Sequence, residues 1–421
     1  MNALADRPTR CAALLATLAA VAPAALAQTV HVVDASQAPG TDFATFAAAL
    51  AAATDGDTLL VRPGNYGEAV TLDGLALSIV VDGPPASVGL LDLDVRNLAA
   101  NEHVTVRGLA LSPQLFGLLP AMSIDHCDGR VQLEDCTFSS ASIGTSGILR
   151  ITDARAVTIS RCTIAPAVGG SFSEASLVVL DSNVALIDSI VSGANGSSTV
   201  IGPSPGTHAM RVVDSRVSIS GSFLTGGIGG DGLPHFGPCQ DGADGGSAFV
   251  MVENGAGDVE IIDTVLVGGA GGAVGGAGCS AGAPGLGVET TPNAGTVVQP
   301  PGTAPHFTLT SPLRAGELLQ FELLGPPNAP VLLLLGLEPG LVRPYDPILT
   351  GVGLVGAPTL ILPYFPIPTD GGFDETDAPG TFVLPSGLTH LHLYFQHVVT
   401  DPVVGLIAST PASLLVLDPA F

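Results

Sequence analysis

A short acidic segment near the end of the chain carries side chains that could bind a metal ion. Four carboxylates fall within eight residues, at Asp370, Asp374, Glu375 and Asp377. Hard cations such as Ca²⁺ prefer carboxylate oxygens, so the cluster is a candidate calcium site, although its spacing differs from that of an EF-hand loop. A solvated acidic turn is the alternative. No other motif requires a cofactor, and Ca²⁺ is therefore the one ion considered.

A second candidate is a pair of histidines in the same part of the chain. His390 and His392 are two residues apart, so they share one face of a strand, as metal-binding His-x-His pairs do. No third ligand is identifiable in the sequence. We therefore expect an ordinary strand with these side chains facing solvent.

The elements that position such residues follow from an eight-residue phrase that occurs six times. Its leading valines are separated by 27, 26, 27, 33 and 42 residues. Positions one and three are apolar, position five interrupts the alternation, and position eight is apolar again, which predicts a strand, a corner and a second strand. Another apolar stretch precedes most copies, which predicts a third strand. The copies are 104–111, 131–138, 157–164, 184–191, 217–224 and 259–266.

A β-phrase recurring at this period indicates coils that stack along one axis. The fold class predicted is therefore all-β, a right-handed parallel β-helix, with equivalent residues of successive coils forming ladders. The fifth position gives one such ladder, Asp135, Asp188 and Asp263. These carboxylates either cap the backbone of the corners or bind cations.

The coils lengthen toward the C-terminus through insertions made of Gly, Ala, Pro and Ser. These insertions, at 193–208, 226–246 and 268–287, all leave the coil at the same point. A lobe of loops on one side of a solenoid is often its binding face. Tolerated drift of surface loops is the alternative.

Five cysteines remain once the first 27 residues are set aside. Cys239 and Cys279 lie at nearly matching places in successive glycine-rich insertions, so we predict a disulfide between them. Cys136 and Cys162 both occupy position six of the phrase. They are expected to stack as inward-facing thiols, with a second disulfide as the alternative. Cys127 is then left without a partner.

Residues 1–27 have the features of a signal peptide: two arginines, an apolar run and an Ala-Leu-Ala cleavage site before Gln28. We therefore expect an exported protein, secreted or at the cell surface, with the periplasm as the alternative. No later apolar stretch is long enough and free of Pro to span a bilayer. The net charge is −25, which disfavours nucleic acid as a partner and leaves neutral polysaccharide or extracellular matrix. The oligomeric state is not predicted.

Residues 30–72 predict a strand, a capped Ala-rich helix, a Gly-Asp turn and another strand. Pro63-Gly64 is expected to form a tight turn, and a helix at this place would cover the open end of the solenoid. Together with the coil phrase, this segment resembles the start of the pectin-lyase-like superfamily of right-handed β-helix proteins, pectinesterases among them. The resemblance covers about residues 29–290. The fold motif comprises Asp42, Phe43, Gly56, Asp57, Pro63, Gly64, Tyr66 and Glu68.

The catalytic motifs of that superfamily are absent from this sequence, so no catalytic residue is predicted. Ile124-Asp125-His126 is similar to an Ile-Asp-His element of pectate lyases, but the preceding Trp is replaced by Ser123. A turn between strands is the simpler interpretation of these residues. The chain also has no Trp and only four Tyr, although sugar-binding clefts commonly use these rings for stacking.

After a predicted linker at 291–305 the phrase disappears, and short strands separated by Pro/Gly turns predict a β-sandwich over 306–421. This part resembles C-terminal appendages of secreted bacterial proteins. The organisation is thus a signal peptide (1–27), a β-helix (28–290), the linker and the sandwich. The function predicted is non-catalytic adhesion or matrix and glycan binding. The alternative is a polysaccharide lyase or esterase acting along the coils.

Overall fold

The computed structural model of the 421-residue chain describes most residues after the predicted signal peptide, which lies outside them. The described residues are 28–112, 120–139, 147–166, 174–199, 201–233, 239–252, 257–292, 294–342, 349–350, 353–355, 360–363, 367, 372–374, 390–401, 405–419 and 421.

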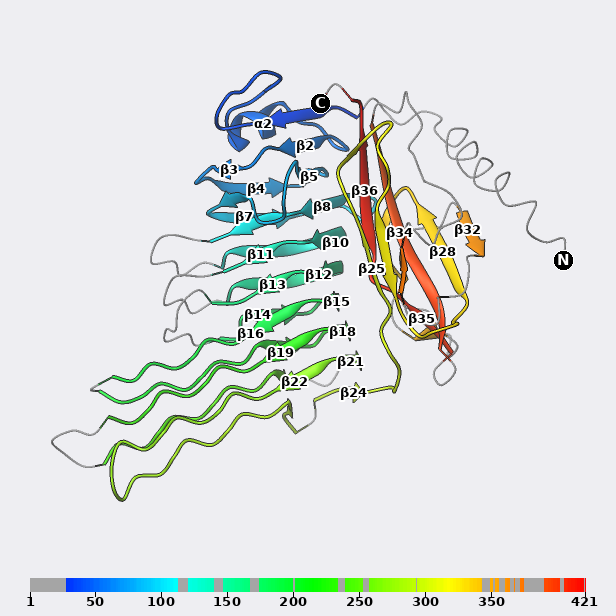
Figure 1. Ribbon diagram of the computed structural model, residues 1–421. Helices are drawn as coiled ribbons and strands as arrows, with labels where there is room; N and C mark the ends of the chain where they lie inside the picture. Colours follow the sequence, from blue (N-terminus) through cyan, green and yellow to red (C-terminus); the bar gives the residue numbers. More distant parts are fainter. Residues whose placement is uncertain are drawn as a thin grey trace.

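The N-terminal part is a right-handed parallel β-helix, which confirms the predicted fold class (Figure 1). Each complete coil contributes one strand to each of three parallel ladders, as the repeated phrase and the apolar stretch before it predict. The first ladder corresponds to that preceding stretch. It contains β4 (Ala69–Asp73), β7 (Asp92–Arg96), the first half of β10 (Met122–Glu134), the first half of β12 (Leu149–Ser160), β14 (Leu177–Leu180), β17 (Met210–Val213), β20 (Phe249–Val252) and β23 (Val288–Thr290).

The second and third ladders correspond to the two halves of the phrase. The second contains β1 (Val30–Val33), β2 (Thr58–Val61), β5 (Ser78–Val81), β8 (His103–Arg107), the second halves of β10 and β12, β15 (Asn183–Ile187), β18 (Arg216–Ser220), β21 (Asp258–Ile262) and β24 (Thr296–Val298). The third contains β3 (Gly64–Asn65), β6 (Val88–Leu90), β9 (Leu109–Leu111), β11 (Thr137–Phe138), β13 (Thr163–Ile164), β16 (Ile190–Ser192), β19 (Phe223–Thr225) and β22 (Val265–Val267).

Position five of the phrase is the corner between the second and third ladders. Its residue has a left-handed backbone in all six copies, with φ of 53° at Asp135, 52° at Arg161 and 58° at Gly221. Gly adopts this conformation freely and Asp tolerates it better than most residues, which explains the composition of this position. A second left-handed corner joins the first ladder to the second, at residues that include His126.

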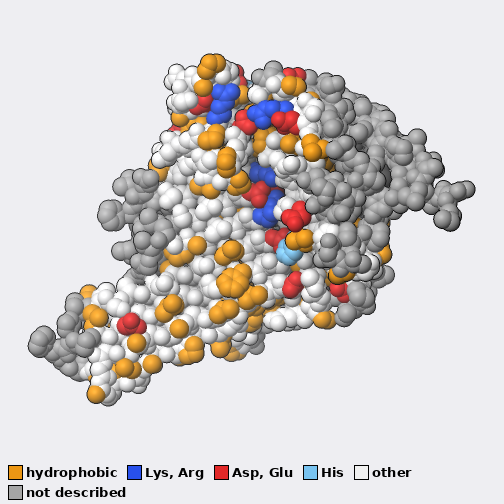
Figure 2. All heavy atoms as spheres, in the orientation of Figure 1, with side chains coloured by type: hydrophobic (Ala, Val, Ile, Leu, Met, Phe, Trp, Pro, Cys, Tyr) orange, Lys and Arg blue, Asp and Glu red, His pale blue; other side chains and the backbone are white. Residues whose placement is uncertain are grey.

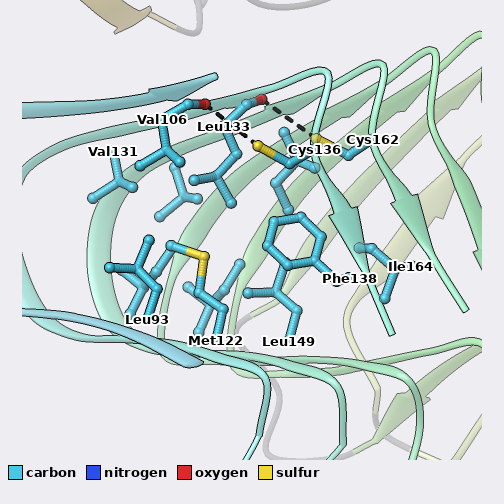
Figure 3. Packing of buried hydrophobic residues seen from close by; sticks show 14 of the residues in the cluster. Leu93, Val106, Met122, Val131, Leu133, Cys136, Phe138, Leu149, Cys162 and Ile164 are labelled. Atoms are coloured by element: carbon cyan, nitrogen blue, oxygen red, sulfur yellow. Dashed lines mark hydrogen bonds between the residues drawn. The ribbon is translucent and has the colours of Figure 1, made fainter. Parts of the chain in front are cut away.

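The interior of the solenoid is filled by stacked apolar side chains, one layer per coil (Figure 3). Positions one, three, six and eight of the phrase point inward, so Val131, Leu133, Cys136 and Phe138 are all at most 1% exposed. Cys136 and Cys162 are free, buried thiols in adjacent layers, and each donates weakly to a backbone carbonyl of the coil before it. Cys127 is also free and buried.

The N-terminal end of the solenoid is closed by α2 (Phe46–Ala52), which Thr45 caps through the amide of Ala48. The carboxylate of Glu68 accepts the amides of Phe46 and Ala47, where the helix leaves its first N–H groups unpaired. Tyr66 packs edge-on against Phe46.

The other residues of the fold motif order the segments around this cap. Asp42 accepts the amide of Val32, Phe43 packs against His31, and Asp57 accepts the amides of Thr29 and Thr54. Gly56 has φ of 89°. The turn predicted at Pro63-Gly64 is centred on Pro63, which lies in a bend between β2 and β3. Gly64 already belongs to β3, where its amide pairs with Ser87 of the next coil.

The C-terminal domain is a β-sandwich. One sheet contains β25 (His306–Leu309), β27 (Phe321–Leu324) and β33 (Gly372–Asp374), and the other is built around β28 (Val331–Gly336), β34 (His390–Asp401) and β36 (Ala412–Leu417). Side chains from both sheets form one core, among them Phe307, Leu323, Leu335 and Leu414. The larger sheet also contains β26 (Leu313–Arg314), β30 (Leu349–Thr350), β32 (Leu360–Pro363) and β35 (Gly405–Ala408), and β29 (Pro339–Val342) pairs with β31 (Gly353–Val355).

The predicted linker begins too early. Residues 296–298 form β24, which pairs with β21, so the solenoid continues to Val298 and only 299–305 connect it to the sandwich. The Pro- and Gly-rich composition concealed one more Thr-Val-Val strand of the second ladder. The sandwich then folds back along the coils, and β34 and β36 lie beside them in Figure 1.

Candidate binding surface

The outward face of the second ladder is covered by the C-terminal domain. Thr105, Glu134 and Ser160 point away from the solenoid core, yet none of them is exposed. At the N-terminal end, Leu60 and Val80 of the coils share an apolar cluster with Leu415 and Leu417 of β36. This face therefore lies inside the molecule and is closed to a large ligand.

A buried ionic network holds the two domains together over the middle coils. Glu134 accepts Nη2 of Arg161 at 3.2 Å and the hydroxyl of Ser413 at 3.0 Å, and it lies 3.5 Å from Arg107. Arg161 also donates to the carbonyl of Pro411 at 2.9 Å. Burial disfavours charge at Asp135, but Arg161 and Arg107 outweigh it and hold the pKa of that carboxyl below its ordinary value.

The aspartates at the corners take part in the same junction. Asp188 accepts the hydroxyl of Thr410 and pairs with His306, and Asp263 accepts the amide of Ala304 at 2.9 Å. Asp188 and Asp263 thus bind groups of the C-terminal part of the chain, whereas Asp135 pairs with Arg107 and Arg161 of the coils on either side. Capping of their own corners was therefore the wrong expectation. Figure 2 shows charged side chains and a histidine in a column along this boundary.

The histidine pair also faces the coils, so the expected solvent-facing strand is wrong. Nε2 of His390 lies 3.0 Å from the hydroxyl of Thr58, and Nδ1 of His392 lies 3.2 Å from that of Ser78. Tyr394 continues the series with Thr105 at 2.8 Å. Alternate residues of β34 thus contact three successive coils. The sequence could not reveal this, because the partners are about 300 residues away.

These buried histidines predict that acid weakens the folded protein. Burial lowers the pKa of His392 and of His397 to about 3, so the folded state holds both rings neutral. An unfolded histidine binds a proton below pH about 6.5, and the stability that these residues contribute is lost as pH falls below that value. We expect the free energy of unfolding to fall by about 1 kcal/mol per pH unit for each residue between pH 6.5 and 5.

Urea unfolding of residues 28–421 at several pH values measures this slope. His306 acts in the opposite direction, because its hydrogen bond to Asp188 raises its pKa, so its contribution is complete below pH about 6.5 and is lost above its folded pKa. A His392→Gln variant should flatten the acid slope by the share of one histidine. An unchanged slope in that variant would contradict the assignment.

The outward face of the first ladder carries partly exposed charged pairs. Glu174 lies between Arg150 and Arg211, at 3.6 and 3.3 Å, and Arg96 pairs with Asp73 at 3.1 Å. Ser123 donates to Asp94 on the neighbouring strand. This is where the described residues gather carboxylates, arginines and a histidine on the coils outside the domain junction.

The Ile124-Asp125-His126 element lies at the edge of this face. His126 has φ of 51° and forms the corner within β10, which confirms a turn between strands. Its ring is 3.0 Å from Asp125 and largely exposed, as an ordinary surface pair would be.

The glycine-rich insertions form an ordered lobe of extended segments that project from the coils (Figure 1). We call residues 193–208, 226–246 and 268–287 the glycine lobe. Its backbone hydrogen bonds recur every third residue: Gly226, Gly229 and Gly232 donate to Val267, Ala270 and Ala273 at 2.8–2.9 Å. A period of three is that of the polyproline II helix, which has no internal hydrogen bonds and must pair with neighbours.

The segments pack in two layers, one continuing from the third ladder and one returning to the first. The amide of Gly227 donates to the carbonyl of Thr207, and the amide of Gly246 donates to the carbonyl of Gly227. These hydrogen bonds join the two layers. A Cβ at Gly227 would lie 1.8 Å from the carbonyl oxygen of Ala194, and one at Gly269 would lie 1.9 Å from that of Gly227. Only glycine fits at these crossings, and the composition of the lobe is therefore a packing requirement.

The carboxylates of the lobe are engaged within it. Asp231, Asp241 and Asp244 each accept the amide of a residue in the next segment, at 2.6–2.7 Å. At its tip, a disulfide joins Cys239 and Cys279, whose Cα atoms are 5.4 Å apart. Asp241 lies beside these sulfurs, but their disulfide leaves no thiolate to bind a metal ion.

The third ladder and the adjoining layer of the lobe expose a row of large apolar side chains. Ile190, Phe223 and Val265 are register partners on three successive coils and are 47%, 41% and 52% exposed. Val267 and Ile228 extend this set at 45% and 49%. Figure 2 shows hydrophobic side chains gathered over these lower coils. We call these five residues the apolar row.

The predicted calcium site lies largely outside the described residues. Asp370, Glu375 and Asp377 are not among them, and Asp374 is described only as the last residue of β33. A calcium site at these residues stays a prediction. Thermal unfolding in Ca²⁺ against EGTA, at constant ionic strength, measures it: a rise specific to Ca²⁺ indicates a site, and no rise indicates a solvated turn.

The apolar row and the order within the lobe were not predicted from the sequence. Position seven of the phrase holds Ile190, Phe223 and Val265, and an apolar residue at an outward position was the available signal. The spacing of Gly226, Gly229 and Gly232 was the signal for the period of three.

No protein family model matches the chain, and no curated protein matches it. Solved structures similar to it include a mutant pectin methylesterase in complex with hexasaccharide IV, a pectin methylesterase in complex with hexasaccharide VII, and pectin methylesterase PemA from Erwinia chrysanthemi. Their TM-scores are 0.35, 0.33 and 0.29, each at 14% identity, covering 56% of this chain and 78% of the other. A likeness at this identity concerns the fold and transfers no activity. Among the described residues, no helix is long and apolar enough to cross a bilayer.

Proposed function

We propose that this chain is an exported, non-catalytic protein of the cell surface or extracellular space that binds polysaccharide or matrix through the glycine lobe and the apolar row. The observation that carries the proposal is the ordered backbone lattice of the lobe, which holds an exposed apolar surface in a fixed shape. A rigid surface loses little conformational entropy on binding.

The chemistry of this surface favours a neutral ligand. The carboxylates Asp231, Asp241 and Asp244 accept amides inside the lobe, and the row itself is uncharged. The faces of sugar rings present C–H groups that pack on apolar side chains such as Phe223. An anionic polymer would instead be repelled by the net charge of −25.

The runner-up is a polysaccharide lyase or esterase acting on the first ladder. The charged groups around Arg150, Glu174 and Arg211 favour it, because such enzymes need acids and cationic groups in one groove. In this chain, however, Glu174 forms ion pairs with both Arg150 and Arg211. The acid and the two cations therefore bind one another, which makes this alternative the weaker one.

Co-sedimentation of the mature chain with insoluble cellulose, chitin and pectin tests the proposal, with released product assayed in the same tubes. We expect binding to at least one polymer without product, and a loss of affinity of about tenfold in Phe223→Ser, a size typical of one interface aromatic. Arg150→Gln is the control and should bind normally. Product that disappears in Arg150→Gln would overturn the proposal in favour of the enzyme.

A further inference from the structure

The C-terminal end of the solenoid is open, in contrast to the end closed by α2. Strands β22, β23 and β24 each end their ladder, and among the described residues no strand pairs with their outer edges. A free strand edge presents unpaired N–H and C=O groups that can pair with another chain. Solenoids ordinarily close such an end with a polar capping unit.

The interior positions of this last coil are only half buried. Leu266, Val288 and Val297 occupy the places that Leu224, Phe249 and Val259 fill one coil earlier. The earlier residues are at most 2% exposed, whereas Leu266, Val288 and Val297 are of intermediate exposure. Around them Val265, Leu286 and Val298 are more than half exposed. The core of the solenoid therefore reaches the surface at this end.

The edge of the glycine lobe is open at the same end. Gly226 and Gly229 donate their amides to carbonyls of the segment that follows, 268–287 and the residue before it. The equivalent residues of that last segment are Gly268 and Gly271. Their amides have no acceptor among the described residues. The hydrogen-bonding lattice of the lobe thus ends with free donors beside the free strand edges.

This end also carries little charge. Between residues 264 and 304 the one charged side chain is Glu289, in a chain with 38 acidic residues. Its carboxylate accepts the hydroxyl of Ser247 at 2.6 Å. Two molecules of net charge −25 repel one another, and contact through this nearly uncharged end avoids bringing further carboxylates together.

We propose that the open end of the solenoid is a self-association surface, and that its occupant is the open end of a second copy of this chain. A two-fold axis would place the two ends face to face, which is the isologous arrangement of most homodimers. Each edge offers both donors and acceptors, so two identical edges can satisfy one another. The contact would bury the half-exposed core positions of both copies.

Sedimentation velocity of the mature chain over about 1 to 100 µM tests this proposal, a range that covers ordinary dimer affinities. We expect a monomer–dimer equilibrium that Val265→Lys with Val298→Lys shifts toward monomer by at least about tenfold, because the interface would then bring lysines of both copies together. Because the side chains of both residues are more than half exposed, we expect the double variant to fold normally. Ile190→Lys is the matched control: it occupies the same ladder position two coils away and should dimerise normally.

Amide hydrogen exchange gives a second reading on the unmodified chain. Protection of the amides of Leu266, Val288 and Val297 should rise with protein concentration, whereas protection in α2 should not. A chain that stays monomeric at the highest concentration, or a dimer broken by Ile190→Lys and not by the double variant, would overturn the proposal. Polysaccharide binding is measured separately, by co-sedimentation, because Ile190 and Val265 also belong to the apolar row.

Discussion

Replacing Gly269 by alanine should destabilise the glycine lobe by about 3 kcal/mol, the upper part of the range for overpacked sites. The new Cβ would lie 1.9 Å from the carbonyl oxygen of Gly227, and the contact is with backbone that cannot move without breaking the hydrogen bonds of two segments. The measurement is amide hydrogen exchange of the lobe together with thermal unfolding. We expect rapid exchange throughout the lobe and a lower Tm.

Gly276 provides the matched control, since a Cβ there would meet nothing within 4 Å. Gly276→Ala should change stability by no more than about 0.5 kcal/mol, and a small gain would reflect the restricted unfolded chain. If both variants behave alike, the lobe is not the close-packed lattice described above. The same pair also links stability to binding, since Gly269→Ala should lose polysaccharide binding and Gly276→Ala should keep it.

Removing the carboxylate of Glu134 should have the second large effect. Glu134→Ala leaves Arg107 and Arg161 buried between the domains with Asp135 as their remaining shared anion, so one positive charge is unbalanced. Breaking a buried ion pair from one side costs about 3–5 kcal/mol. Urea unfolding of the full chain measures the loss. We expect the junction of the sandwich and the coils to be the part that weakens.

Two comparisons make this prediction specific. Arg155→Ala removes an exposed pair with Asp128 and should cost about 1 kcal/mol or less. Adding Arg107→Met to Glu134→Ala should restore much of the loss, because the remaining Arg161 and Asp135, 2.8 Å apart, still form a balanced pair. An equal effect of Glu134→Ala and Arg155→Ala would contradict a buried network.

The sequence predicted the solenoid well because its signals are local and repeated. The corner at position five, the inward thiols Cys136 and Cys162, and the cap around Glu68 all depend on neighbours in the same or the next coil. A periodic fold repeats the same evidence in every coil, and a mistaken reading of one copy is corrected by the others.

Contacts between distant parts of the chain were not predictable in the same way. His390 and His392 are an ordinary strand pair in the sequence, and only the docking of β34 on the coils gives them partners. The end of the solenoid was predicted too early for a similar reason: a single Thr-Val-Val strand between prolines is too short to be recognised as part of another coil. The pattern of the lobe is local, but its period of three is hard to recognise in the sequence, because glycine also occupies other positions of the same segments.

The measurement that tests the binding function most directly is the footprint of a bound polysaccharide in amide hydrogen exchange. A soluble fragment of whichever polymer retains the protein is added to the mature chain, and protection is compared with the free state. We predict protection at the apolar row and the lobe, in residues 190–192, 223–231 and 265–270. Protection centred instead on the first ladder, at Asp94, Ser123 and Arg150, would contradict the proposed function and favour an enzyme.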